Sequence, residues 1–336
     1  MMRFTTMKTK LRKYPSIFLI LLLAISSCFL TGCVNQHPKD SKKSSQGESV
    51  ETMLEITDPK EKQAVLNAKA KVKALSGNPR IVATSPAVAD ICDKLDLDLV
   101  GVPKSSVSKI PSRYKKVKKV GLAMSPDMEI VSSLNPDWIL APSSLETDLK
   151  PKFEELKNTE YAFLNLRSVQ GMYRSAQELG EIFGKQQEAE KMTKEFTTFY
   201  KSYTKRNKNK KHPKVLVLMG LPGSYVIATE NSYVGSLIKL AGGENVYVNT
   251  EDMKKKEPDI IVRAAHALPD QVTKMFNEDF ETNDIWKHFD AVKNKRVYDL
   301  TYEYFGMSAN FKYKKALSEL EKDFYQNTKG TQEVKE

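Results

Sequence analysis

The sequence predicts an α/β fold of two similar lobes with mainly parallel sheets, joined by one long helix. Three observations predict it: a repeated helix–turn–strand unit, several short apolar strands between helices, and one long amphipathic stretch near the middle of the chain. Short β-branched apolar runs between helices are typical of parallel sheets that helices cover on both faces. A unit that occurs twice indicates two lobes built alike.

The repeated unit occupies residues 129–140 and 251–262. Each copy has a glutamate, six further residues, a Pro-Asp pair and an apolar run. The pattern predicts a short helix, a turn and a buried strand in each copy. Further strands are expected at residues 80–84, 214–219 and 296–299. The two lobes are therefore predicted at residues 58–184 and 213–336.

The segment between the lobes, residues 185–212, is predicted as a connecting helix and a turn. Gly184 interrupts the helical pattern before it, and five apolar residues then recur at spacings of three and four: Ala189, Met192, Phe196, Phe199 and Tyr203. Residues 187–206 would span about 30 Å as a helix. Because a single rigid helix is a poor hinge, we expect the lobes to close on a ligand only slightly.

Residues 1–32 have the features of an export signal, which would lie outside the fold. A basic stretch, Lys8–Lys13, precedes an apolar run that is too short to span a bilayer as a lasting anchor. The run ends in Leu30-Thr-Gly-Cys33, which is typical of a bacterial lipobox with an acylated cysteine; the alternative is an ordinary cleavage site beside an incidental cysteine. Two or more acyl chains hold a protein to a membrane stably. We therefore expect a lipid-anchored protein on the outer face of the cytoplasmic membrane.

Residues 33–57 are predicted as the lipidated cysteine and a flexible tether, because residues 34–51 are polar and lack periodicity. The fold would then begin near Asp58. Loss of the five basic residues of the leader lowers the formal charge from +11 to +6. The remaining basic residues are spread over lysine-rich turns, which gives nucleic-acid binding little support. Cys92 is the one cysteine left after Cys28 and Cys33, so no internal disulfide can form.

Four dispersed segments resemble those of one protein family: Val100-Gly-Val-Pro, Val120-Gly-Leu-Ala-Met-Ser-Pro-Asp, Ser168-Val-Gln-Gly-Met and Asn283-Asp-Ile-Trp-Lys-His-Phe-Asp-Ala-Val. From Arg80 to Tyr325 the chain resembles the helix-linked, periplasmic-type binding proteins of iron–siderophore, cobalamin and haem importers. More narrowly, it resembles the haem-receptor lipoproteins of the iron-regulated surface determinant system.

The resemblance implies a periplasmic-binding-protein-like fold and haem b as the transported ligand. It further implies a two-fold symmetric ABC importer permease as partner and haem-donor proteins at the cell surface. A ferric-siderophore receptor of the same fold is the alternative function. We expect a monomer and no enzymatic activity, because the chain lacks a Gly-rich phosphate loop, a G-x-S-x-G elbow and an H-E-x-x-H motif.

The resemblance also implies two axial haem ligands, Met124 and His266. A Met/His pair is one of the ligand sets that hold haem iron. Ser125-Pro126 predicts a helix start, which would put Met124 in the preceding loop. The alternative is that Met124 is a hydrophobic staple, but the fourth helical residue would be Glu129, which is no apolar partner for it. His266 follows a predicted strand and precedes the helix start Leu268-Pro269, where open α/β sheets bind ligands. The alternative for His266 is a structural role. The other histidines are less favoured, since His37 lies in the tether, His212 in a lysine-rich turn and His288 beside Trp286.

Other candidate contacts are weaker. Ser85, Pro86 and Ala87 begin a predicted helix directly after the first strand, and free amides there could bind the haem propionates or serve only as a cap. Tyr225 and Met307 are candidate porphyrin contacts or core residues.

Glu129 and Glu251 occupy matching positions in the two repeats. The resemblance implies that they dock onto permease arginines through charge-assisted pairs. The alternative is two exposed helix glutamates.

Overall fold

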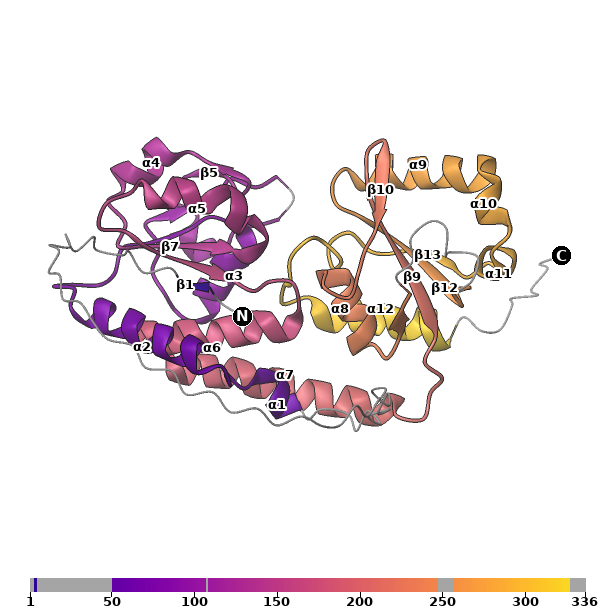
Figure 1. The fold of residues 1–336 in the computed structure, drawn as a ribbon, viewed down its shortest axis with the longest axis horizontal. Helices are drawn as coiled ribbons and strands as arrows, with labels where there is room; N and C mark the ends of the chain where they lie inside the picture. Colours follow the sequence, from indigo (N-terminus) through magenta and orange to yellow (C-terminus); the bar gives the residue numbers. More distant parts are fainter. Residues whose placement is uncertain (1–2, 5–49, 107, 247–256, 327–336) are drawn as a thin grey trace, which may run out of the picture.

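The computed structural model describes residues 3–4, 50–106, 108–246 and 257–326, and within them two α/β lobes lie side by side along one long helix (Figure 1). This helix, α7 (Gln186–Asn207), runs beneath both lobes. It follows Gly184, which ends α6 (Val169–Phe183) in a left-handed conformation with φ of 73°. The predicted fold class is confirmed.

The sheet of the first lobe has the strand order β1-β8-β7-β2-β3-β4. All pairs are parallel except that of β1 with β8. The strands are β1 (Arg3–Phe4), β2 (Ile81–Ala83), β3 (Gly101–Val102), β4 (Lys118–Lys119), β7 (Trp138–Pro142) and β8 (Glu160–Leu164). The helices before α6 are α1 (Val50–Leu54), α2 (Pro59–Lys73), α3 (Pro86–Lys94), α4 (Met128–Ser133) and α5 (Glu146–Glu154). A hairpin of β5 (Gly121–Leu122) and β6 (Ser125–Pro126) leads into α4.

The second lobe has a sheet of order β10-β9-β12-β13, with β11 also paired to β9. Its strands are β9 (Lys214–Leu221), β10 (Ser224–Ile227), β11 (Glu244–Asn245), β12 (Ile260–Ala265) and β13 (Val297–Asp299). Only β10 runs antiparallel to its neighbour. Its helices are α8 (Tyr233–Leu240), α9 (Pro269–Thr282), α10 (Asp284–Lys287), α11 (Asp290–Lys293) and α12 (Tyr313–Tyr325). Every residue of β7 and of β12 is buried, as expected for parallel strands covered on both faces.

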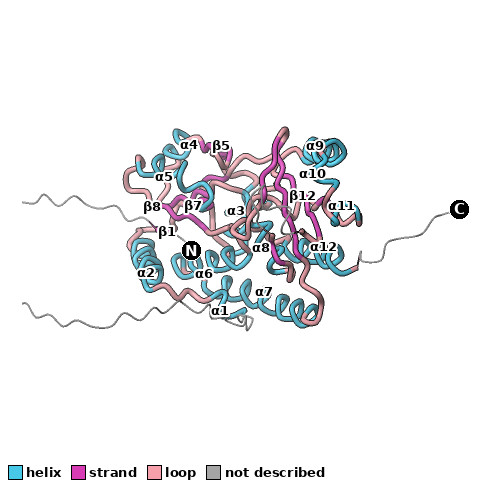
Figure 2. Tube along the Cα trace, turned by 45° about the vertical axis from the view of Figure 1, so that its right-hand side comes forward, coloured by secondary structure: helices cyan, strands magenta, loops and turns pink. Residues whose placement is uncertain are grey.

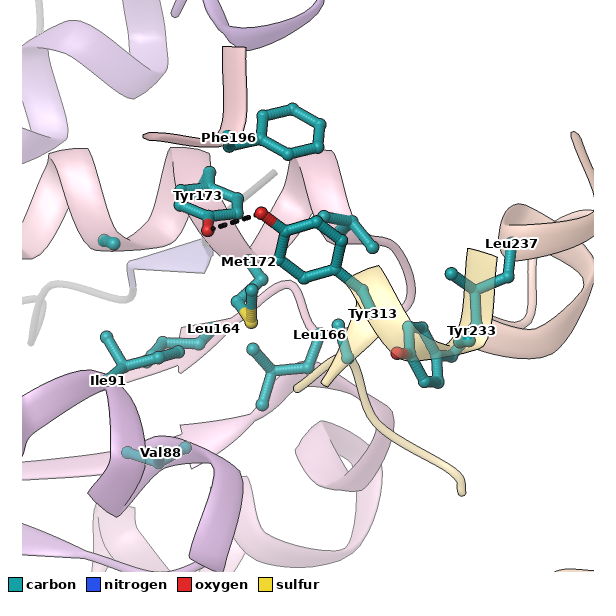
Figure 3. Packing of buried hydrophobic residues seen from close by; sticks show 14 of the residues in the cluster. Val88, Ile91, Leu164, Leu166, Met172, Tyr173, Phe196, Tyr233, Leu237 and Tyr313 are labelled. Atoms are coloured by element: carbon teal, nitrogen blue, oxygen red, sulfur yellow. Dashed lines mark hydrogen bonds between the residues drawn. The ribbon is translucent and has the colours of Figure 1, made fainter. Parts of the chain in front are cut away.

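One hydrophobic cluster continues from the first lobe through α7 into the second. Phe196 of α7 stacks on Tyr173 of α6 with ring centroids 4.8 Å apart and meets Tyr313 of α12 edge to face at 5.6 Å. The hydroxyls of Tyr173 and Tyr313 are hydrogen-bonded at 3.2 Å, as Figure 3 shows. The lobes are therefore joined by packed side chains as well as by the chain itself.

The N-terminal boundary differs from the prediction. The first described helix, α1, begins at Val50 and not near Asp58, and its residues Val50 and Leu54, which lie one helical turn apart, are both buried. The last part of the predicted tether was therefore wrong. Residues 5–49, with Cys33 and His37, lie outside the described residues.

β1 belongs to the predicted leader, which was expected to lie outside the fold. Arg3–Phe4 pairs antiparallel with β8, whose edge offers free N–H and C=O groups to an extended segment. Cleavage of a leader would remove β1 and leave β8 at the edge. Within the described ranges, no helix combines the length and apolar character that crossing a membrane requires.

Glu178 of α6, which is buried beside the buried Glu61 of α2, makes stability dependent on pH. Glu61 and Glu178 are 4% and 1% exposed, and Arg174 bonds Glu61 at 3.0 Å. Burial and the adjacent Glu61 raise the pKa of Glu178 to about 9. The folded state thus keeps a proton that the unfolded state releases near pH 4.5, so stability falls as pH rises between these values.

Glu178→Gln, which is neutral at every pH, should remove this dependence. We expect the variant to exceed the wild type by about 1–3 kcal/mol in free energy of unfolding at pH 9 and to approach it at pH 5. Urea unfolding at both pH values measures this difference, with the exposed Glu190→Gln as control. If the free energy of unfolding changed with pH in the same way in wild type and Glu178→Gln, the raised pKa of Glu178 would be contradicted.

Candidate functional site

The candidate site lies in the loops that follow the carboxyl ends of the parallel strands. Exposed large apolar side chains of the described residues gather there, apart from Leu66 on α2: Leu122, Met124, Leu221, Val226, Leu268 and Met307. They lie on the β5–β6 and β9–β10 hairpins and after β12 and β13. Figures 1 and 2 show both hairpins on the side of the molecule opposite α7. Because open α/β sheets bind ligands at this edge, both lobes present apolar side chains where a ligand is expected.

Met124 lies in the two-residue turn of the β5–β6 hairpin and is 66% exposed. The predicted helix start at Ser125-Pro126 was wrong, since both residues are in β6. Asp127 caps α4 instead, and its side chain accepts a hydrogen bond from the Ile130 amide at 3.1 Å. Asp127 caps as well as serine does, and Pro126 is compatible with an edge strand.

Gly121 allows the chain to form this hairpin. Its φ is +96°, and a Cβ there would lie 2.8 Å from the Asp127 amide nitrogen. The hairpin holds Met124 away from the core, which excludes the hydrophobic-staple alternative.

His266 directly follows β12 at its carboxyl end. Its amide donates to the Gly220 carbonyl at 2.8 Å, and its own carbonyl accepts from the Tyr302 hydroxyl at 3.4 Å. The imidazole Nδ1 is buried and has no hydrogen-bond partner in the described part of the chain. Burial lowers the pKa of His266, so the ring is neutral at physiological pH. With Nδ1 enclosed, Nε2 is the nitrogen that a ligand can reach.

The loop after His266 has an unusual backbone. Leu268, at the start of α9, has φ of 46° and a side chain that is 55% exposed. A left-handed conformation at a residue other than glycine is strained and occurs preferentially at functional sites. This geometry supports a binding role for the loop.

Ser85 is the N-cap of α3, as predicted, and it is 5% exposed. Its hydroxyl accepts from the Val88 amide at 3.3 Å, so the capping role is filled. Pro86 has no N–H group, and the amide of Ala87 is the first available for an anion. Contact of Ser85, Pro86 and Ala87 with propionates remains a prediction.

Tyr225 and Met307 have different surroundings. The Tyr225 hydroxyl donates to the Asp279 carboxylate at 2.8 Å, and its ring lies against Phe276 and Trp286. Tyr225 is thus fixed by packing in the second lobe. Met307 is 53% exposed in the loop after β13.

Of the two permease-docking candidates, only Glu129 lies in the part of the chain that the structure describes. Glu129 is exposed in the first turn of α4, on the side opposite α7 (Figure 1). Glu251 lies outside the described residues. The remaining histidines lie elsewhere: His288 is exposed after α10, and His212 is hydrogen-bonded to the Gly242 carbonyl at 2.6 Å.

The sequence reasoning did not identify Leu122, Leu221, Val226 or Leu268 as candidate ligand contacts. Leu122 and Leu221 lie next to hairpin turns, Val226 lies within β10 and Leu268 lies in a loop. An apolar residue at such a position does not reveal from the sequence alone whether it is buried. Their exposure became visible only with the hairpins in place.

A known protein family matches this chain. The family described as periplasmic binding protein matches residues 81–304. The chain belongs to this family. It is therefore a binding protein and not an enzyme, as its relatives are binding components of transport systems.

Individual relatives are more similar still. The high-affinity heme uptake system protein IsdE of Staphylococcus aureus (strain Newman) is 43% identical over 264 residues, which cover 76% of this chain and 90% of that protein. The crystal structure of S. aureus IsdE complexed with heme has 42% identity and a TM-score of 0.69, covering 74% of this chain and all of that one.

An ABC transporter substrate-binding protein from Listeria monocytogenes EGD-e has 48% identity and a TM-score of 0.71, covering 75% of this chain and all of that one. The resemblance that four short segments predicted is confirmed.

Proposed function

We propose that this protein is a membrane-anchored haem receptor, which captures haem between its two lobes and delivers it to an ABC-type importer. The observation that carries the proposal is the position of Met124 and His266, each in a carboxyl-end loop of a different lobe. The similarity to an IsdE crystallised with heme supports the same ligand.

The chemistry of the site suits a metalloporphyrin. A neutral imidazole offers a lone pair to iron, and burial lowers the pKa of His266, which favours the neutral ring. Met124 offers an exposed thioether. The exposed Leu122, Leu221 and Val226 can cover the apolar faces of a porphyrin. The α3 N-terminus, through the Ala87 amide, is the proposed propionate contact.

An absorption spectrum of the purified protein during haem addition tests the proposal. We expect saturation at one haem per protein and a low-spin, six-coordinate spectrum. A ferric-siderophore receptor would instead bind ferric siderophore, remain without bound haem, and be indifferent to changes at Met124 and His266.

The lipid anchor at Cys33 is part of the proposal, because residues 30–33 form a lipobox-like sequence. Cys33→Ser should abolish acylation and release or mislocalise the protein. Detergent partitioning and cell fractionation measure this change, and Cys92→Ser, at a buried cysteine, is the control. Unchanged partitioning of the Cys33→Ser protein would contradict the anchor. We further propose a monomer on the outer face of the cytoplasmic membrane, loaded by surface haem-donor proteins.

Glu129 and Glu251 are proposed to dock onto the permease. Glu129→Ala and Glu251→Ala should each lower haem uptake by cells about tenfold, as expected for loss of a charge-assisted pair. Haem binding by the isolated proteins should be unchanged, because Glu129 lies on α4 and outside the hairpin that carries Met124. Equal loss of binding in the purified variants would place these residues in the ligand site.

A further inference from the structure

We propose that the second lobe contains another binding site, for a small organic anion with a flat apolar body. The site lies at the amino ends of the parallel strands, remote from the loops at their carboxyl ends, which are called the haem loops below. A cavity of about 300 Å³ lies there, between the turn that follows α7 and the end of α12. Its volume is at the lower end of the range for small-molecule sites. Six of its lining residues carry the argument: Lys210, Lys211, Pro213, Arg296, Phe324 and Tyr325.

The cavity is separate from the haem loops. Lys214 begins β9, Asp259 precedes β12 and Arg296 precedes β13, so the cavity lies at the amino ends of these strands. The haem loops follow the carboxyl ends of the same strands. β9 has eight residues, which corresponds to roughly 25 Å of extended chain. A ligand in the cavity therefore cannot touch haem, and the inference is independent of the proposed haem function.

Arg296 provides the main indication of a ligand. Its Nη2 donates to the Phe324 carbonyl at 3.3 Å, while its Nε is buried and has no acceptor among the described residues. A buried donor without an acceptor is costly, and a ligand oxygen that drew the guanidinium into the cavity would give Nε an acceptor and remove that cost. A carboxylate or phosphate can accept from two guanidinium N–H groups at once.

The charges around the cavity favour an anion. Lys211 is exposed at the rim, whereas Lys210 is held by Glu321 at 3.2 Å and lies 4.6 Å from the Tyr325 ring centre. Asp259 is the acidic residue of the lining, and its carboxylate accepts from the Lys214 amide at 2.8 Å. Arg296 and Lys211 thus provide positive charge that this lining does not cancel.

Apart from Gln326, the remaining wall is apolar. Pro213 lines it, and the Phe324 and Tyr325 rings are perpendicular, with centroids 5.8 Å apart. An inorganic ion would leave this wall without contacts. An aromatic ring with one carboxylate or phosphate group satisfies both parts of the cavity.

Calorimetric titration of the purified protein with phenyl phosphate tests the site. We expect one saturable site with a Kd below about 1 mM, and at least about tenfold weaker binding of inorganic phosphate or of phenol alone. Benzoate, titrated in parallel, distinguishes a carboxylate ligand from a phosphate ligand. Addition of haem should leave phenyl phosphate binding unchanged.

Variants identify the residues. Arg296→Met should weaken phenyl phosphate binding at least about tenfold, since it removes charge-assisted hydrogen bonds. Lys211→Met should weaken it less. Lys208→Met, an exposed lysine at the end of α7 outside the cavity, is the matched control. Lys211→Met also provides the test if Arg296→Met fails to fold. Absence of saturable binding, or equal affinity in wild type, Arg296→Met and Lys211→Met, would overturn the proposal.

Discussion

His266→Ala is expected to lower haem affinity by at least about tenfold, which corresponds to about 1.4 kcal/mol. Imidazole is the stronger ligand for ferric iron, and the buried Nδ1 of His266 leaves Nε2 free to bind it. The variant also loses the side chain from a loop with a strained backbone at Leu268. Haem titration of the purified variant, together with transfer of haem to an apoprotein acceptor, measures the loss.

Met124→Ala should have a different effect. The exposed thioether is a soft ligand that favours ferrous iron, so its removal should shift the spectrum and lower the reduction potential while haem stays bound. Met128→Ala and His288→Ala are matched controls, because Met128 is partly buried in α4 and His288 is exposed after α10. Wild-type spectra and affinities in both Met124→Ala and His266→Ala would refute the axial assignment and leave only the general proposal of haem binding.

Phe196→Ala is expected to destabilise the protein by about 3–5 kcal/mol. Phe196 is fully buried and contacts Tyr173 of the first lobe, Tyr313 of the second and Tyr200 of α7. Its removal would open a cavity where the lobes meet, and the packed Tyr173–Tyr313 pair limits collapse into it. Urea unfolding measures the change.

Leu66→Ala, on the exposed face of α2, is the control and should change stability by less than about 0.5 kcal/mol. A loss below about 1 kcal/mol for Phe196→Ala would mean that the joint between the lobes contributes little to folding stability. Two unfolding transitions in the variant would show that Phe196 couples the lobes.

Periodicity and turn residues predicted the strands and the long helix well. Residues 187–206 and the strand after Pro258-Asp259 were predictable because a long amphipathic face and a continuous apolar run each have one structural solution. The hairpin around Met124 was not, since Ser125 and Asp127 offer two helix starts two residues apart. Strand pairing across the turn decides between them, and pairing is not a local property.

α1 was missed for a related reason. Five residues are too few for an independent helix, and Val50 and Leu54 gain their stability from packing on the rest of the fold. The His266 loop was predictable as a strand end. The enclosure of Nδ1, which gives this histidine its chemical character, depends on neighbours that sequence spacing cannot specify.

The position of α1 determines which side of the domain a lipid anchor at Cys33 would tie to the membrane. The fold begins beside α7, whereas α4 and both hairpins lie on the opposite side (Figure 1). Sixteen residues, 34–49, separate Cys33 from α1. Under the proposed anchor at Cys33, the chain would approach the membrane from the side of the domain where α1 begins, and both hairpins would face away from the membrane. A domain of this size has a radius of gyration of about 19 Å. Docking both hairpins onto a permease would therefore require the whole domain to turn over, and release from the permease would let the hairpins face outward again.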